Sequence, residues 1–94
     1  MCNNTGSTVV APTSKGARVW LQGLDSLGWS GGTRYNVVFG DGLIQLQRCV
    51  DGKRKVTASK GGVIDLESKK VAATFAHTET VTYTVTDSTI VIRG

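Results

Sequence analysis

Residues 56–67, VTASKGGVIDLE, place a short basic turn before a run that is typical of a β-strand. The same three residues, Ser-Lys-Gly, occur earlier in residues 11–22, APTSKGARVWLQ, where they again precede an apolar run. Glycine permits a tight turn, and alternation of apolar with other residues is typical of a strand. A 94-residue chain that contains the same basic turn twice is therefore predicted to carry an internal repeat.

The similarity extends beyond the two turns. An offset of 45 residues carries the first turn onto the second and Val19 onto Ile64. An offset of 46 carries the alternating stretch 35–39 onto 81–85, with the hairpin turns and returning strands in step. One extra residue near a short helix reconciles the two offsets. The sequence therefore predicts two copies of one strand–helix–hairpin unit.

The two copies are predicted to form one domain, because a unit of about 40 residues buries too little surface to fold alone. The domain spans residues 1–94, with repeats at about 8–48 and 54–93 and a flexible tail at 1–7. Helical character is confined to short stretches near residues 23–29 and 67–73. Abundant Val and Thr, with 12 Gly, favour a mostly β fold with one or two short helices.

Two longer segments carry a resemblance to a known family. Residues 53–70, KRKVTASKGGVIDLESKK, followed by VTYTVTDSTIVIR, resemble the AbrB/MazE/SpoVT type of swapped-hairpin domain. Residues 18–47, RVWLQGLDSLGWSGGTRYNVVFGDGLIQLQ, also look like its SymE-like branch. The chain departs from the family in having no proline at the start of either helix and in fusing two units that family members usually supply from two chains.

The resemblance implies a double-split β-barrel formed by two interleaved halves, here a single-chain pseudo-dimer of two β-β-α-β-β-like repeats. In the family this fold usually serves a DNA-binding transcription regulator, often an antitoxin. The function expected here is a small regulator that contacts duplex DNA through a pseudo-twofold basic surface around the two turns. The fused molecule is expected to act as a monomer, and further dimerisation is left open.

The basic residues suit such a surface. The net charge is +4, which is compatible with a polyanionic partner. Lysines and a glycine turn offer cations and backbone N–H groups to phosphates, and arginines such as Arg34 could read guanine. The same cations could equally be solvated strand edges that discourage aggregation. The predicted DNA-binding residues are Lys15, Arg18, Lys53, Arg54, Lys55 and Lys60.

Other site chemistries find little support in the sequence. Ser59, Thr57 and the single histidine, His77, do not form a recognisable catalytic triad, and no second histidine exists to act as a base. The chain is therefore not expected to be an enzyme. Cys2 and Cys49 are a poor disulfide or metal framework and are predicted to be free thiols. No cofactor or metal is predicted. Neither a signal peptide nor a membrane span is evident, so a cytoplasmic location is expected.

A protein-binding role on the same scaffold is the alternative function. The two halves have diverged, since Arg18 and Trp20 correspond to Val63 and Asp65. A twofold DNA site gains from identical halves, whereas an asymmetric protein target does not. The alternative is therefore an antitoxin-like or phage-encoded inhibitor of a host machine, and RNA binding stays open without residue-level support.

Overall fold

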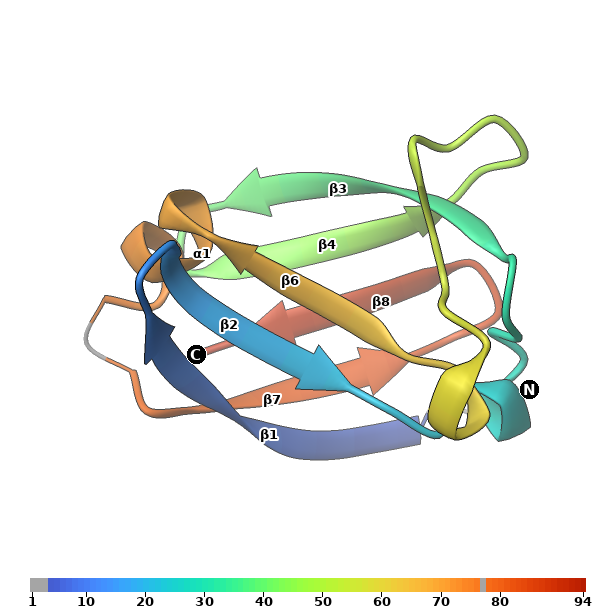
Figure 1. Ribbon diagram of the computed structural model, residues 1–94, viewed down its shortest axis with the longest axis horizontal. Helices are drawn as coiled ribbons and strands as arrows, with labels where there is room; N and C mark the ends of the chain where they lie inside the picture. Colours follow the sequence, from blue (N-terminus) through green and yellow to red (C-terminus); the bar gives the residue numbers. More distant parts are fainter. Residues whose placement is uncertain (1–3, 77) are drawn as a thin grey trace.

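Eight strands form one antiparallel sheet that rolls into a nearly closed barrel (Figure 1). The computed structural model describes residues 4–76 and 78–94. The strands are β1 (Asn4–Thr13), β2 (Gly16–Leu21), β3 (Arg34–Gly40), β4 (Leu43–Arg48), β5 (Arg54–Lys55), β6 (Ile64–Ser68), β7 (Thr80–Val85) and β8 (Thr89–Arg93). Two 3-10 turns, η1 (Leu24–Leu27) and η2 (Ser59–Gly61), and one α-helix, α1 (Lys69–Thr74), connect them. The prediction of a mostly β fold with short helices is confirmed.

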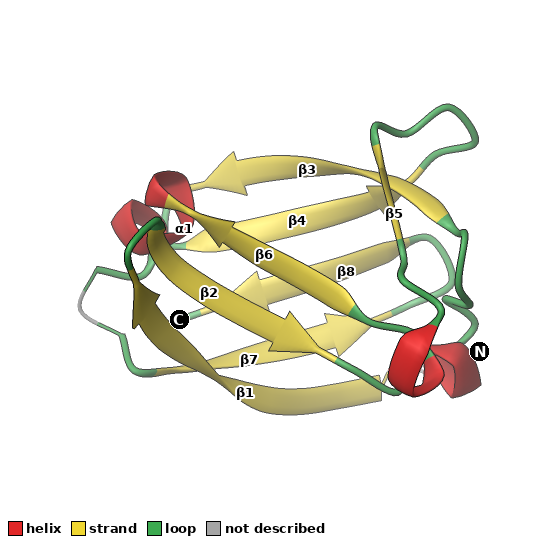
Figure 2. Cartoon of the chain, viewed as in Figure 1, coloured by secondary structure: helices red, strands yellow, loops and turns green. Residues whose placement is uncertain are grey.

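The strand order explains why the barrel nearly closes. Neighbouring strands follow the order β5-β3-β4-β8-β7-β1-β2-β6, which leaves β5 and β6 at the two ends of the sheet. An isolated antiparallel bridge between Thr57 and Val63 joins the segment after β5 to the start of β6. The helical segments lie at the two ends of the barrel, α1 at one and the two 3-10 turns at the other (Figure 2).

Alternation along the strands builds the core. On β2, Ala17, Val19 and Leu21 are buried while the residues between them are half-exposed. On β4, Ile44 and Leu46, which alternate with glutamines in the sequence, are both fully buried. Tyr35, Trp29 and Phe75 complete the core from β3, the loop after η1 and the end of α1. Period-two alternation is what a sheet with one buried face requires.

Strands from the first half of the chain pair with strands from the second half. The hairpin β3–β4 pairs with β5 through Arg34 and Tyr35, and with β8 along β4. The hairpin β7–β8 pairs with β1, from Asn4↔Val85 to Val9↔Thr80. β2 and β6, each following one Ser-Lys-Gly turn, pair directly. Each half of the chain therefore completes its sheet with strands of the other half.

The N-terminal prediction needs a correction. Residues 4–7, expected to belong to a flexible tail, are the beginning of β1 and pair with β7. Gly6 makes this pairing possible, because a side chain there would lie 2.6 Å from the Tyr83 hydroxyl. Residues 1–3, including Cys2, lie outside the described residues, and so does His77.

One aromatic residue occupies another position than the sequence suggests. Phe39, whose alternation with Tyr35 and Val37 favours the core, is 37% exposed near the end of β3. Alternation gives the face of a strand but not whether a neighbouring strand covers its end. The two tryptophans, for which the sequence favours core or rim positions, differ: Trp29 is completely buried and Trp20 is half-exposed on the outer face of β2.

Within residues 4–76 and 78–94, none of the helices has the length and apolar character needed to cross a membrane.

Candidate functional site

The two Ser-Lys-Gly turns lie at opposite ends of the β2–β6 strand pair. Gly16 begins β2, which there pairs with the end of β6 through Ala17↔Ser68. The second turn precedes β6, whose start pairs with the end of β2. Lys15 and Lys60 are both exposed, one at each end of this pair (Figure 1).

Arg18 on the outer face of this pair is bound to a carboxylate. Its Nε and Nη2 donate to the two oxygens of Asp65, at 2.8 and 2.9 Å. The Asp65 hydrogen bond raises the pKa of the Arg18 guanidinium further above its ordinary value. Glu67 lies opposite Arg18 on β6, so the middle of this face contains two carboxylates beside one guanidinium.

Trp20 is covered by two cations on the same face. The Arg18 guanidinium carbon lies 4.5 Å from the centroid of its ring, and Lys60 Nζ lies 5.4 Å from it. Its indole N–H donates to Gln22 at 3.0 Å. These contacts occupy Trp20 within the protein, so it offers less open ring for stacking than its exposure suggests.

The remaining three predicted residues, Lys53, Arg54 and Lys55, form the edge next to β3. Lys55 lies opposite Arg34, and Arg54 lies opposite the buried Tyr35, so the two side chains leave the sheet on opposite sides. Burial raises the pKa of the Tyr35 phenol above its ordinary value, and the nearby Arg54 guanidinium partly offsets that rise. The Lys53 backbone N–H donates to the Asn36 side chain at 3.1 Å.

A second outer face, which we call the hairpin face, is formed by the outward residues of β5, β3, β4 and β8. These positions alternate with the buried Tyr35, Ile44, Leu46, Ile90 and Ile92. Aliphatic Val38, Leu43 and Val91 lie among its polar residues. The cations and amides of the face, with the adjacent Lys53, are Lys53, Lys55, Arg34, Asn36, Gln45, Gln47 and Arg93.

Charge separates the two faces. The β2–β6 face combines Lys15, Arg18 and Lys60 with Asp65 and Glu67. The outward strand positions of the hairpin face hold cations and amides and, among the residues that the structure describes, no carboxylate. Neighbouring β7 adds Thr82 and Thr84 to this surface. The hairpin face is therefore the better surface for a polyanion.

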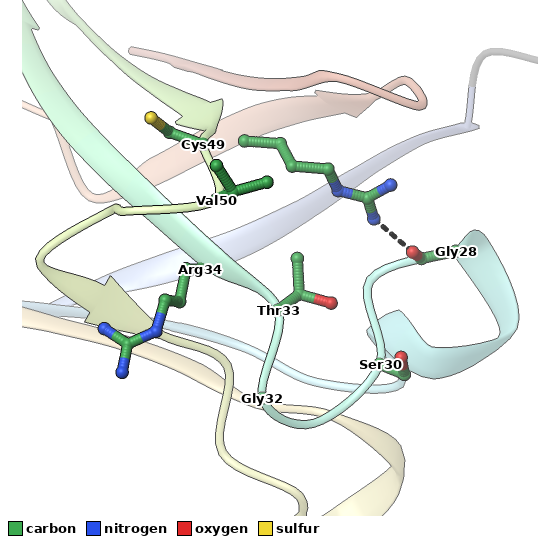
Figure 3. Close-up of a pocket in the computed structure, with 8 residues that line it drawn as sticks. Gly28, Ser30, Gly32, Thr33, Arg34, Cys49 and Val50 are labelled. Carbon is green, nitrogen blue, oxygen red and sulfur yellow. Dashed lines mark hydrogen bonds between the residues drawn. The ribbon is translucent and has the colours of Figure 1, made fainter.

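A shallow cavity of about 450 Å³ opens where β3 and β4 meet the loop after η1 (Figure 3). Arg48 lines it, donates to the Gly28 carbonyl and lies with its guanidinium carbon 4.9 Å from the centroid of the Trp29 ring. Arg34 Nη1 donates to the Gly52 carbonyl at 3.0 Å. Arg34 points away from the Gly28 carbonyl in Figure 3, so the two arginines do not converge on one ligand position. The cavity extends the basic surface and is not a closed pocket.

Cys49 lies in the same cavity as a free thiol. Its Sγ donates to Asp51 Oδ1 at 2.7 Å, and this bond lowers the pKa of the Asp51 carboxyl. In the described part of the chain, no group of three or more His, Cys, Asp or Glu side chains could hold a metal ion.

Sequence reasoning missed most of the hairpin face. Asn36, Gln45, Gln47 and Arg93 were not predicted to contribute to a site. Their shared signal is that each occupies an outward position of an alternating strand, which the sequence does contain. Which of these strands lie side by side comes only from the fold.

Comparison of the chain with protein-family models, with curated proteins and with solved structures gives no significant match.

Proposed function

We propose that the protein is a small duplex-DNA-binding regulator that contacts the DNA backbone through its hairpin face. The observation that carries the proposal is the composition of the hairpin face, which is free of carboxylates at its described strand positions. Arg34, Lys53 and Lys55 lie near one end of it and Arg93 near the other, with the side-chain amides Asn36, Gln45 and Gln47 between the two ends. Cations and amides are the side chains that most often contact phosphate and sugar oxygens. The predicted surface around the Ser-Lys-Gly turns becomes the second candidate for the same ligand.

The proposed scaffold is a single-chain pseudo-dimer of swapped hairpins. Two strand pairs support it through their registers. The β2–β6 pair is symmetric about Trp20↔Asp65, because the offset of 45 converts Val19↔Leu66 into Ile64↔Leu21. The β4–β8 pair is symmetric about Gln45↔Val91 under the offset of 46 in the same way. A twofold relation between the repeats accounts for both registers at once.

The two symmetric pairs bear on the DNA site. A pseudo-twofold axis that passes through Trp20↔Asp65 and Gln45↔Val91 emerges from the barrel through the β2–β6 face and through the hairpin face. Either face could therefore contact the two DNA backbones symmetrically about the axis. The acidic Asp65 and Glu67 beside the axis disfavour phosphate on the β2–β6 face. Gln45 and Val91 beside the axis on the hairpin face carry no such charge.

Duplex is favoured over single-stranded nucleic acid by the absence of stacking groups. Proteins that bind single strands commonly stack bases on exposed aromatic rings. No aromatic side chain occupies an outward position of β3, β4, β5 or β8 in the described residues. Trp20, on the other face, is already covered by Arg18 and Lys60.

The proposal is tested by fluorescence anisotropy with a short duplex at several salt concentrations. We expect salt-sensitive binding, with log K falling by about 0.9 per phosphate contact for each unit of log salt. The double variant Lys53→Gln/Lys55→Gln is expected to weaken binding at low salt and to reduce the slope by about two.

Two charge-matched double variants serve as comparisons. Lys69→Gln/Lys70→Gln removes the same charge from α1 and is expected to change the slope little. Lys15→Gln/Lys60→Gln tests the Ser-Lys-Gly turns. If only Lys15→Gln/Lys60→Gln weakens DNA binding, the DNA site lies on the β2–β6 face. If all three variants weaken DNA binding equally, binding depends on net charge alone. A folded protein that binds no duplex at low salt would end the proposal.

A further inference from the structure

The barrel has an unfilled strand position between β3 and β6. β3 and β6 run in the same direction. Five strands lie between them in the sheet, and each strand runs antiparallel to its neighbours. β5 runs antiparallel to β3 but pairs with it only at Arg34 and Tyr35. Beyond that point β3 continues to Gly40 without a strand on this side within the described residues.

Backbone groups of both strands point into this gap. Val56 N–H donates to the Thr33 carbonyl on the β5 side, and Cys49 N–H donates to the Arg34 carbonyl on the β4 side. Since the direction alternates along a strand, the N–H and C=O groups of Val37 and Phe39 face the gap. On β6, Val63 exchanges hydrogen bonds with Thr57 on the side of the gap. By the same alternation, the N–H and C=O groups of Asp65 and Glu67 also face the gap.

The floor of the gap is apolar and its margin is mainly basic. A cavity of about 200 Å³ opens there, beside α1. Lys70 Nζ lies 5.6 Å from the centroid of the Phe39 ring. Apolar Val37, Phe39, Leu66 and Val71 share the lining with Ser68, with the cations Arg54 and Lys70 and with one carboxylate, Glu67.

The other half of the molecule shows what fits such a position. The offset of 46 relates β3 to β7 and the middle of β1 to β5. Adding it to Arg34 gives Thr80, and subtracting it from Lys55 gives Val9, so the pair Arg34↔Lys55 corresponds to the pair Thr80↔Val9. In that half, residues 4–8 continue the strand along β7. Their counterparts, residues 50–54, instead begin in the turn after β4, where Gly52 N–H donates to the Cys49 carbonyl. The edge that is filled along β7 is therefore open along β3.

We propose that the open edge of β3 receives an extended acidic peptide of a partner protein as an added strand, antiparallel to β3. Main-chain hydrogen bonds to Val37 and Phe39 would supply affinity, as in other strand-addition complexes. Apolar side chains in the middle of the peptide enter the cavity between Val37 and Leu66. Acidic side chains at its two ends meet Arg54, opposite Tyr35, and Lys70, beside Phe39. This site borders the hairpin face along β3, and the proposal does not rest on DNA binding.

The test uses two synthetic eight-residue peptides with alternating valine and threonine in the middle. One has two glutamates at each end and the other has two lysines at each end. They are titrated into the ¹⁵N-labelled protein and followed by NMR. We expect the glutamate peptide to shift the amides of residues 36–40 and to slow hydrogen exchange at Val37 and Phe39. The lysine peptide is expected to bind at least about fivefold more weakly.

Three variants distinguish binding at the open edge of β3 from general electrostatic attraction of the peptide. Lys70→Glu is expected to weaken the glutamate peptide about fivefold, and Lys69→Glu, its exposed neighbour on α1, to leave the affinity unchanged. Phe39→Pro removes an N–H that faces the gap and is expected to abolish binding while the near-ultraviolet circular dichroism stays native.

Several results would overturn the proposal: no shift at residues 36–40 at millimolar peptide, equal binding of both peptides, or retained binding by folded Phe39→Pro. Concentration-dependent protection of the same amides without peptide would assign the edge to a second copy of this chain instead. Duplex binding by Lys70→Glu serves as the reference for an intact hairpin face, so failure of the peptide site and failure of DNA binding are distinguishable.

Discussion

Gly16 and Gly61 end the same three-residue motif but meet different surroundings. Gly16 has φ +131°, and a Cβ there would lie 2.3 Å from the Ser68 carbonyl oxygen. Gly61 has φ +76°, and a Cβ there would meet only the Gly23 Cα, at 3.5 Å. The first turn therefore requires glycine for space as well as for conformation.

We expect Gly16→Ala to lower the free energy of unfolding by about 2–4 kcal/mol, because strain and overlap act together. Gly61→Ala should lower it by only about 1–2 kcal/mol, since the left-handed conformation alone is disfavoured. Urea denaturation at neutral pH measures both. Equal effects would show that Ser68 moves aside without cost.

Tyr35 should make stability depend on pH in the alkaline range. Its folded pKa is raised by burial, so above the ordinary phenol value the unfolded chain loses a proton that the folded chain keeps. The contribution of Tyr35 is thus complete below about pH 10 and is lost as pH rises toward its folded pKa. Urea denaturation between pH 8 and 11 should show a steeper alkaline decline for the native protein than for Tyr35→Phe. If the stability of both proteins fell equally with pH, the Tyr35 phenol would have the same pKa in the folded and the unfolded chain.

At the scale of elements, Trp29 ties the loop after η1 to the β7–β8 turn. Its ring is fully buried, and its indole N–H donates to the Thr86 carbonyl at 2.8 Å. Trp29→Phe should destabilise the fold by about 1–3 kcal/mol, since it vacates volume and leaves that carbonyl unpaired. Trp20→Phe, on the half-exposed outer face, should cost less than about 1 kcal/mol. Thermal denaturation of both variants compares them, and a larger loss for Trp20 would contradict this ranking.

Alternation predicted the strands well and their neighbours poorly. The stretches around β3, β4, β7 and β8 were predicted within one residue or so of their bounds, because each alternates between turns rich in glycine or polar residues. Residues 4–7 of β1 were missed, since their small polar side chains carry no apolar period. Their strand conformation comes from pairing with β7, far away along the chain.

At the scale of the whole molecule, neither repeat should fold without the other. Each hairpin pairs with strands of the opposite repeat, through β4–β8, β1–β7 and β3–β5. We expect fragments 1–50 and 51–94 to be unfolded separately and to form native structure when mixed. Far-ultraviolet circular dichroism and NMR of each fragment and of the mixture provide the measurement. A folded spectrum from either fragment alone would contradict an interleaved core.

The candidate site could be predicted only in part. The basic run at residues 53–55 was visible in the sequence because its members are adjacent. The pairing of Arg18 with Asp65 was not, because it joins residues of two strands brought together by the fold. The hairpin face likewise depends on Gln45 of β4 and Arg93 of β8 lying on neighbouring strands, and no local pattern encodes that.

The pairing of β1 with β7 also sets the order in which the barrel can be completed. Asn4 lies beside Val85, so this part of β1 has its partner only after the chain between them has been made. Pairings between such distant residues close large loops and form slowly compared with local turns. Until β7 leaves the ribosome, β1 exposes an unpaired edge that another chain could join. This edge of β1 is therefore where we expect pairing with another chain to compete with folding.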